Sequence, residues 1–291
     1  KLVGSRANQL KNKLESDYSE NKSRLEISAT RSLEKQLIDV TLPGEPYQIG
    51  RLHPTTRTIK EICDIFISMG FQIAEGPDVE WEYYNFEALN MPSEHPARDA
   101  FATLWVDYKT PTGARPMLMR THTSPVQIRT MEKNKPPIRI IAPGRVYRYE
   151  ATDATHEWMF SQVEGLAVDR NVTMADLKGT LFEFVRRLFG KDRKCRFRCD
   201  YFPFVEPGVE IAVDCFMCGG SGCRLCGNSG WIEILGAGMV HPEVLRICGI
   251  DPDMYSGFAF GMGVERIPIL RYGIDDIRHF YANDLRFLKQ F

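Results

Sequence analysis

Apolar side chains are sparse in the first 36 residues, and those present follow a helical period. Val3, Leu10, Leu14 and Tyr18 lie at spacings of seven and four, which place them along one side of a helix. The pattern predicts an exposed helix with one narrow seam, which fits either half of an antiparallel helix pair or a solvated surface helix. The turn-forming sequence LPGEP at 42–46 then ends this helix.

The remainder of the chain changes to a mixed pattern in which strands dominate. A helix is predicted over 53–71, where Ile59, Ile62 and Phe66 share one face, and 76–89 is predicted to be extended. Further helices are predicted only at 173–189 and 263–272. Strands are predicted at 116–120, 138–141, 145–150, 158–168, 196–202, 209–216, 230–236 and 256–261. Many strands with few helices between them favour a largely antiparallel sheet, and therefore an α+β fold.

Composition narrows the class of protein. The chain has 291 residues, of which 43% are hydrophobic, enough for a sizeable core. It contains no run of 18 apolar residues, so we expect no membrane span. The formal net charge of −1 means that any contact with nucleic acid must come from local basic patches. The chain begins at Lys1 and not at Met, so we expect its natural N-terminus to lie upstream, and no signal peptide is visible in the sequence given.

The sequence GRVYRYEATDATHEWMFSQVEG, residues 144–165, predicts a hairpin with chemistry on one face. Side chains two apart on a strand share a face, so Arg148 and Glu150 lie together, as do Phe160, Gln162 and Glu164. A guanidinium binds phosphate, a carboxylate accepts from an amine, and an aromatic ring stacks on a base. The pattern therefore predicts a site for a nucleotide beside an amine-bearing substrate. The alternative is a cross-strand ladder of ion pairs on a solvated face.

A second stretch, SGFAFGMGVERIPIL at 256–270, favours the ligand site. It reads as a glycine-rich strand that leads into a helix carrying Arg266. Small residues let a ligand approach the backbone, and an arginine near a helix N-terminus adds positive charge there. The sequence GxxxxGK[ST] is absent from the chain, which excludes the ordinary Walker ATPases.

Four of the eight cysteines lie in the twelve-residue sequence CFMCGGSGCRLC. They form two CxxC pairs separated by four residues, three of them glycine: Cys215, Cys218, Cys223 and Cys226. Four thiolates at this spacing favour a structural Zn²⁺ site in a reducing compartment, so we expect a cytoplasmic protein. The alternative is a set of reduced thiols on a loop. The segment 215–227 lies between two predicted strands, as a hairpin insertion would.

Two of these stretches resemble known motifs. PGRVYRYEATDATHEWMFSQVEG is similar to motif 2 of the class II aminoacyl-tRNA synthetases, and GFAFGMGVERIPILRYGIDDIR is similar to their motif 3. RTHTSPVQIR, YFPFVEPGVEI and GAGMVHPEVL narrow the resemblance to the α subunits of bacterial phenylalanyl-tRNA synthetases. The resemblance implies an antiparallel sheet flanked by helices as the catalytic domain at 41–291. It also implies a partial, coiled-coil-like tRNA-binding arm at 1–40, whose first helix is absent.

The resemblance also implies an activity and its partners. Members of this family convert phenylalanine and ATP to phenylalanyl-adenylate and transfer the aminoacyl group to tRNA(Phe). They work as α₂β₂ assemblies with a β subunit, and they use Mg²⁺. Two alternatives are a non-catalytic RNA-binding protein on the same scaffold and an ATP-dependent amide ligase. The first should lack some ATP-contact residues, and the second should lack both the Phe-x-Phe sequence and THTSP, yet all are present.

The family's functional residues have counterparts in this chain. The resemblance implies that Arg148 holds the α-phosphate of ATP and that Glu206 binds Mg²⁺. The other implied ATP contacts are Glu150 at the adenine, Phe160 stacked on it, His156 at the outer phosphates and Arg266 at the pyrophosphate end. The implied phenylalanine contacts are His122, Ser124, Gln162 and Glu164 around the ammonium and carboxylate, and Phe202, Phe204, Ala259 and Gly261 around the ring. Phe101 departs from the family pattern, where some relatives carry a larger aromatic residue.

Overall fold

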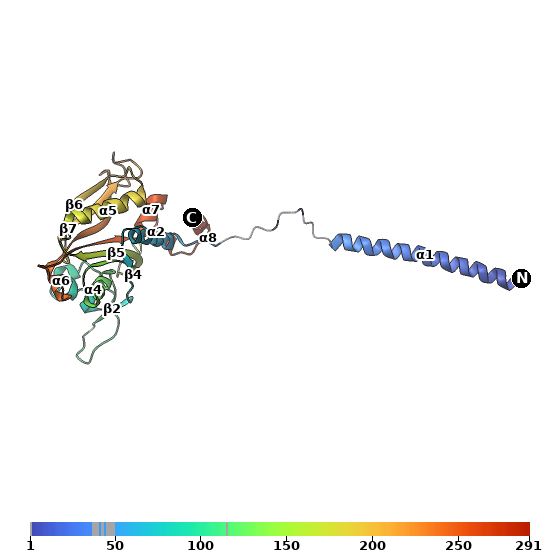
Figure 1. The fold of residues 1–291 in the computed structure, drawn as a ribbon, viewed down its shortest axis with the longest axis horizontal. Coiled ribbons are helices and arrows are strands. Elements are labelled where there is room, and N and C mark those ends of the chain that lie inside the picture. Colours follow the sequence, from blue (N-terminus) through green and yellow to red (C-terminus); the bar gives the residue numbers. More distant parts are fainter. Residues whose placement is uncertain (1, 37–40, 42–43, 45–49, 115) are drawn as a thin grey trace. The chain divides into compact units, whose positions relative to one another are not determined.

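The computed structural model describes residues 2–36, 41, 44, 50–114 and 116–291, with side chains described from residue 3 to 30 in the first helix. Two compact units result, residues 1–50 and 51–291. In the first, α1 (Leu2–Gln36) is a helix of 35 residues, as predicted (Figure 1). Its seam residues Val3, Leu10, Leu14 and Tyr18 are exposed. The predicted break at 42–46 lies outside the described residues except for Gly44.

The second unit is built on a seven-stranded sheet in the order β1-β4-β5-β9-β8-β7-β6. Every neighbouring pair is antiparallel except β1–β4, which is parallel. A separate two-stranded sheet pairs β2 with β3. The strands are β1 (Gln72–Ile73), β2 (Val79–Trp81), β3 (Met117–Met119), β4 (Ile138–Tyr147), β5 (Met159–Asp169), β6 (Cys195–Phe202), β7 (Val205–Asp214), β8 (Trp231–Val240) and β9 (Ser256–Gly263). The predicted α+β class with a largely antiparallel sheet is confirmed.

Helices cover both faces of this sheet. The predicted helices are present as α2 (Pro54–Ser68), α5 (Met174–Phe189) and α7 (Arg266–Tyr272). The remaining helices are α3 (Glu82–Asn85), α4 (Ser124–Lys133), α6 (Pro242–Ile247), α8 (Leu285–Leu288) and the 3₁₀ turns η1 (Glu87–Leu89), η2 (Pro96–Arg98) and η3 (Ile277–Phe280). No helix in the described ranges is long and apolar enough to cross a membrane.

Three of the predicted elements are wrong in detail. The segments 138–141 and 145–150 form one strand, β4, which ends at Tyr147. Of the stretch 76–89, only β2 is extended, and α3 and η1 follow it. The chain turns there because the buried Asn85 donates from Nδ2 to Thr121 Oγ1, 3.0 Å away, while Phe86 packs into the core. These tertiary contacts outweigh the local strand pattern.

The two faces of the sheet carry different cores. Under α2 and α5, the larger core stacks Phe66 between Phe184 and Phe260, with ring centroids 4.8 Å apart in both pairs. The opposite face carries a smaller core with α4, α6 and η1, which includes Leu166 and Ala259.

The larger core requires a glycine at position 165. Gly165 lies on β5 directly opposite Phe260 on β9. A Cβ atom on Gly165 would lie 2.1 Å from Cζ of the Phe260 ring. That ring is held by Phe66, so it has little freedom to move away.

We therefore predict that Gly165→Ala lowers the free energy of unfolding by about 1–3 kcal/mol, the usual cost of overpacking a core. Gly179→Ala is the matched control, because Gly179 lies in α5 and a Cβ atom added there would meet no described atom within 4 Å. The control should raise the free energy of unfolding by up to about 1 kcal/mol through helix propensity. Denaturant titration measures both, and a shift of the same sign and size in the two variants would contradict the packing account.

Candidate active site

The β4–β5 hairpin places the predicted side chains on the open face of the sheet. Phe160 lies opposite Val146, and the Arg148 amide continues the pairing by donating to Trp158 O at 2.9 Å. The guanidinium carbon of Arg148 lies 5.2 Å from the centroid of the Phe160 ring and 5.6 Å from that of Phe101. Arg148 and Phe160 lie together as alternation predicts, but β4 ends at Tyr147, so the alternation does not extend to Glu150, whose amide donates to Arg148 O in a turn. A simple ladder of ion pairs is not observed among the described residues.

Arg148 is a fixed and unneutralised cation. Its Nε donates to Thr121 O at 3.2 Å, and no carboxylate of the described chain lies within ion-pairing distance of its guanidinium. Burial lowers the pKa of Arg148, while the charges of Glu150 and Glu164 raise it. A guanidinium held in this way can take an anion without first releasing a protein partner.

Glu164 is the best-anchored carboxylate on this face. It is 6% exposed, and it accepts from the Thr123 amide at 2.9 Å, from Ser124 Oγ at 2.5 Å and from Gln127 Nε2 at 2.9 Å. Burial raises the pKa of Glu164, whereas these hydrogen bonds and the charge of Arg120 lower it. All three donors come from the start of α4, so the carboxylate ties β5 to that helix.

Two other polar groups nearby have no partner. His122 is 4% exposed, and neither ring nitrogen has a hydrogen-bond partner among the described residues. Oε1 of Gln162 is buried and unpartnered in the same sense. Burial and the charge of Arg148 lower the pKa of His122 to about 3, so its ring is neutral at physiological pH. Buried polar groups without partners point to a polar ligand that supplies them.

An aromatic pocket adjoins these groups. The ring of His122 lies 5.2 Å from that of Phe101 and 6.4 Å from that of Phe204, and Phe202 stacks on Phe204 at 5.9 Å. Ala259 lies in the smaller core against which both phenylalanines pack. Phe101, which departs from the family pattern, therefore belongs to this wall.

Glycines form the floor of the pocket beside Glu164. A Cβ atom on Gly236 would lie 3.0 Å from Phe202, and one on Gly261 would lie 3.0 Å from Glu164. The register aligns Glu164, Gly261 and Gly236 across β5, β9 and β8. The glycines thus let the Phe202 ring and the Glu164 carboxylate lie against the sheet, which places an aromatic end and an acidic end side by side.

The remaining predicted ATP residues lie towards the other end of the hairpin. His156 is exposed in the loop, where its ring nitrogen lies 3.2 Å from a carboxylate oxygen of Asp153. Arg266 is exposed at the start of α7, and its charge lowers the pKa of Glu233, which burial and neighbouring carboxylates raise. Glu150 is half-buried within the field of Arg148.

Glu206 does not join this group. Its side chain is 74% exposed and lies 3.3 Å from His241 Nε2, at the beginning of β7. Ala212, six residues further along β7, pairs with Glu233 on the phosphate side. At about 3.3 Å per residue, Glu206 is therefore about 20 Å from that side of the face.

The cysteine cluster forms a hairpin extension between β7 and β8, as the sequence predicts. The sulfur atoms of Cys215, Cys218, Cys223 and Cys226 all lie within 4.8 Å of one another. Burial raises the pKa of the Cys226 thiol, but hydrogen bonds from the Cys223 and Gly230 amides outweigh it and lower the pKa to about 6. Clustered thiolates are soft ligands, and this donor set suits Zn²⁺.

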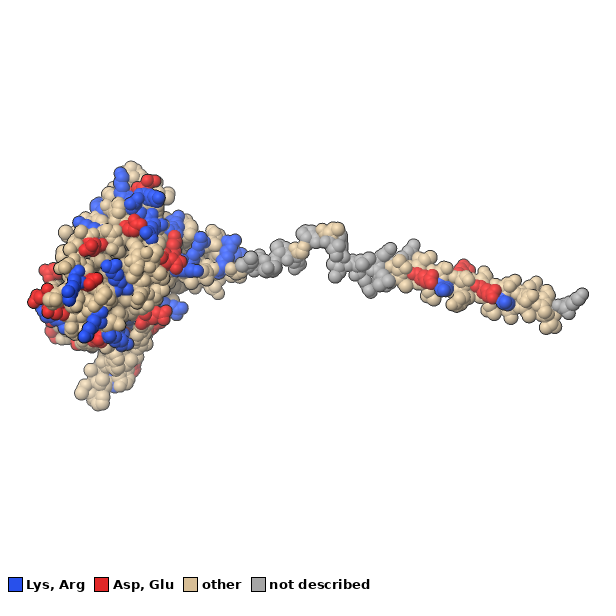
Figure 2. Space-filling view, viewed as in Figure 1, with Lys and Arg blue, Asp and Glu red and all other residues tan. Residues whose placement is uncertain are grey.

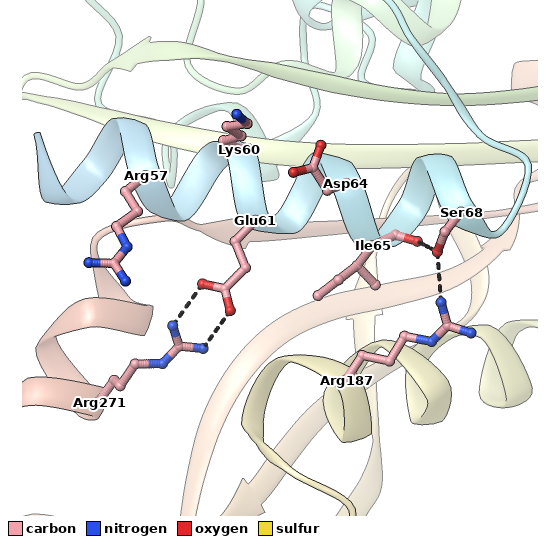
Figure 3. A pocket seen from close by; sticks show the side chains of 8 residues that line it. All are labelled: Arg57, Lys60, Glu61, Asp64, Ile65, Ser68, Arg187 and Arg271. Carbon is pink, nitrogen blue, oxygen red and sulfur yellow. Dashed lines mark hydrogen bonds and ion pairs between the residues drawn. The ribbon is translucent and has the colours of Figure 1, made fainter. Parts of the chain in front are cut away.

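A separate cavity of about 500 Å³ lies on the helical layer over the other face, between α2, α5 and α7 (Figure 3). Arg271 pairs there with Glu61 at 2.7 Å, and Arg187 Nη1 donates to Ser68 Oγ at 2.7 Å. These contacts join the three helices. None of the predicted site residues lines this cavity.

Comparison with known proteins defines the class first. Residues 37–291 match the family model described as "tRNA synthetases class II core domain (F)". The pyrrolysyl-tRNA synthetase from Desulfitobacterium hafniense has the same fold, with a TM-score of 0.57 at 16% identity. The similarity covers 91% of this chain and 82% of that one. The antiparallel sheet with its open face is thus a class II synthetase core.

The particular family follows from closer relatives. The chain is 59% identical over 291 residues to the phenylalanine–tRNA ligase alpha subunit of Dehalococcoides mccartyi strain CBDB1, which covers 100% of this chain and 84% of that protein. It is 56% identical to the subunit of the same name from Bacillus licheniformis, covering 99% and 83%. The chain belongs to the family of phenylalanine–tRNA ligase alpha subunits.

The site contains two residues that the sequence patterns did not indicate, Gln127 and Glu233. Gln127 lies three residues after Ser124, so a helix beginning at Ser124 would place both on one face. That signal was available, but the helix itself was not predicted. Glu233 becomes relevant only through the pairing of β7 with β8.

Proposed function

We propose that this chain activates phenylalanine with ATP and transfers it to tRNA(Phe), as the α subunit of an assembly with a β subunit. The observation that carries the proposal is the arrangement of one face of the sheet. It holds a buried carboxylate, Glu164, beside an aromatic pocket, and an unneutralised guanidinium, Arg148, at the nucleotide end. A substrate with an ammonium, an aromatic ring and a carboxylate fits this order of groups.

Phenylalanine binds with its ring between Phe202, Phe204 and Ala259 and with its ammonium at Glu164. Edge-to-face contacts and apolar burial hold the ring. Ser124 and Gln162 orient the polar end, where Oε1 of Gln162, which has no partner among the described residues, accepts from the substrate ammonium. The neutral His122 adds no charge that would repel the ammonium.

ATP binds with its adenine on Phe160 and beside Glu150. The phenylalanine carboxylate attacks the α-phosphorus in line, a bond to the carboxylate oxygen forms, and the bond to the pyrophosphate oxygen breaks. Arg148 stabilises the charge that develops on the α-phosphate oxygens, and Arg266 and His156 receive the departing pyrophosphate. This is catalysis by positioning and electrostatic stabilisation, with no general base required.

Membership of class II implies Mg²⁺, which neutralises phosphate charge when it is bound. Its usual ligands are carboxylate oxygens and phosphates. Glu206 is the ligand that the resemblance implies, and its exposed carboxylate suits the ion. Because Glu206 lies far from the phosphate side, we assign it an ion apart from ATP, while Glu233 offers a carboxylate near the phosphates.

Helix α1 is proposed as part of the tRNA-binding arm. It carries Lys11, Lys13, Lys22 and Arg24 among exposed side chains. Figure 2 shows charges of both signs interspersed over the visible face of residues 51–291, in keeping with the net charge of −1. The described helix is only weakly basic, with five basic and four acidic residues over 3–30, and its lysines and Arg24 are the groups that would meet a phosphate backbone.

Arg148→Lys tests the activation step. Lysine keeps the charge but loses the rigid fork that binds two phosphate oxygens. Phenylalanine-dependent ATP–pyrophosphate exchange by the αβ complex should fall by about 10² or more, the scale for removing a preorganised donor. The control is Arg139→Lys on β4, the strand that ends just before Arg148; its exposed side chain faces away from the site. Exchange by Arg148→Lys within about threefold of the parent would argue against this role.

The four clustered cysteines are proposed to hold a structural Zn²⁺. Elemental analysis should find about one zinc per α chain. Cys223→Ser should lower both the zinc content and the melting temperature, because metal binding is coupled to local folding. Cys199→Ser is the control, since this exposed thiol lies on β6 outside the cluster. A metal-free parent whose melting temperature is unaffected by Cys223→Ser would remove the assignment.

A further inference from the structure

The edge strand β6 contributes arginines to the same open face. Arg196 pairs with Ala212 on β7, and Ala212 pairs in turn with Glu233 on β8. Arg198, two residues along, pairs with Glu210. Glu210 pairs with Gly236, which belongs to the pocket floor. The side chain of Arg196 therefore lies on the substrate face, two strands from Glu233, or about 10 Å between backbones.

Arg196 differs from the arginines around it. Arg198 forms an ion pair with Glu210, and Arg193 forms one with Asp214 at 3.2 Å. Arg196 has no carboxylate within ion-pairing distance in the described part of the chain. Its guanidinium carbon lies 4.9 Å from the centroid of the Trp231 ring, and its buried Nε has no hydrogen-bond partner there. A half-buried cation is thus held in place by an aromatic ring without being neutralised.

Arg266 supplies a second cation on the other side of Glu233. The charge of Arg266 acts on Glu233, so the two residues lie within electrostatic reach of each other. Arg266 too has no ion pair with any residue that the structure describes. Glu210, Asp200 and Arg198 also act on Glu233, and Arg198 is ion-paired with Glu210. Arg196 and Arg266 are therefore the two arginines around Glu233 that form no ion pair with the described residues.

We propose that Arg196 binds the distal phosphates of ATP and the pyrophosphate product, from the side opposite Arg266. The proposal rests on the function proposed above, because it takes the bound nucleotide to lie on this face. A guanidinium that is stacked on Trp231 keeps its edge free, and that edge suits two phosphate oxygens. The arginine would hold pyrophosphate at one end while the α-phosphorus reacts at Arg148.

The test compares Arg196→Gln and Arg196→Lys with the parent αβ complex in ATP–pyrophosphate exchange. Arg196→Gln should raise the KM for pyrophosphate and for ATP by about tenfold or more, as expected for the loss of a hydrogen bond to a charged group. Arg196→Lys should recover part of that loss. The KM for phenylalanine should stay within about twofold, because Arg196 lies away from the aromatic pocket. Arg186→Gln is the control, because Arg186 also lies over an aromatic ring, Phe182, but on α5.

Calorimetric titration with inorganic pyrophosphate measures the affinity of the same site when no reaction takes place. A Kd raised about tenfold in Arg196→Gln supports the proposal. Unchanged pyrophosphate binding with a lowered melting temperature overturns it and leaves Arg196 as a packing residue for Trp231. A defect confined to transfer onto tRNA also overturns it. Absence of phenylalanine-dependent exchange in the parent would count against the proposed function, and the titration would still decide the role of Arg196.

Discussion

The buried carboxylate of Glu164 is the interaction on which the rest of the site depends. Removing a carboxylate from water is costly unless it is fully hydrogen-bonded. Three donors from the start of α4 meet that requirement, and in doing so they fix the helix against β5. The segment just before α4 is fixed with it. Thr121 then accepts from Arg148, and His122 closes the aromatic pocket, so one buried charge positions both ends of the site.

One face of the sheet carries the main hydrophobic core, and the other face carries the substrate site. The face under α2 and α5 is closed by stacked rings and requires the bare backbone of Gly165. On the other face, glycines on β8 and β9 let Phe202 and Glu164 pack directly against the backbone, where an added Cβ atom would lie 3.0 Å from each. The carboxylate of Glu164 and the guanidinium groups of Arg148 and Arg266 separate negative from positive charge along this face, which orients a substrate that carries both an ammonium and phosphates. This charge separation runs from the ammonium at Glu164 to the phosphates at Arg148 and Arg266.

Local patterns in the sequence predict those parts of the site that depend on neighbouring residues, but not those that depend on contacts between distant segments. Alternation places Arg148 with Phe160, and CxxC spacing brings the thiols together, because each depends on neighbours in sequence. The role of Gln127 depends on a partner 37 residues away, and that of Arg196 depends on the order β8-β7-β6. The stretch 76–89 has a strand-like pattern, yet the buried Asn85 and Phe86 turn it into α3 and η1. Pairings set by tertiary contact leave no local signal.

The central claim is that Glu164 receives the ammonium of the amino acid. Calorimetry of the αβ complex with phenylalanine and with 3-phenylpropanoate, which lacks only the ammonium, tests it most directly. The parent should bind phenylalanine more tightly by roughly tenfold to a hundredfold, the range for a charge-assisted hydrogen bond. Glu164→Gln should remove most of that preference, and because it also weakens the contacts that hold α4, the ratio of the two Kd values, not either Kd alone, is the quantity compared with the parent. If the isosteric variant keeps the full preference for phenylalanine, another group binds the ammonium and the account of this face is wrong.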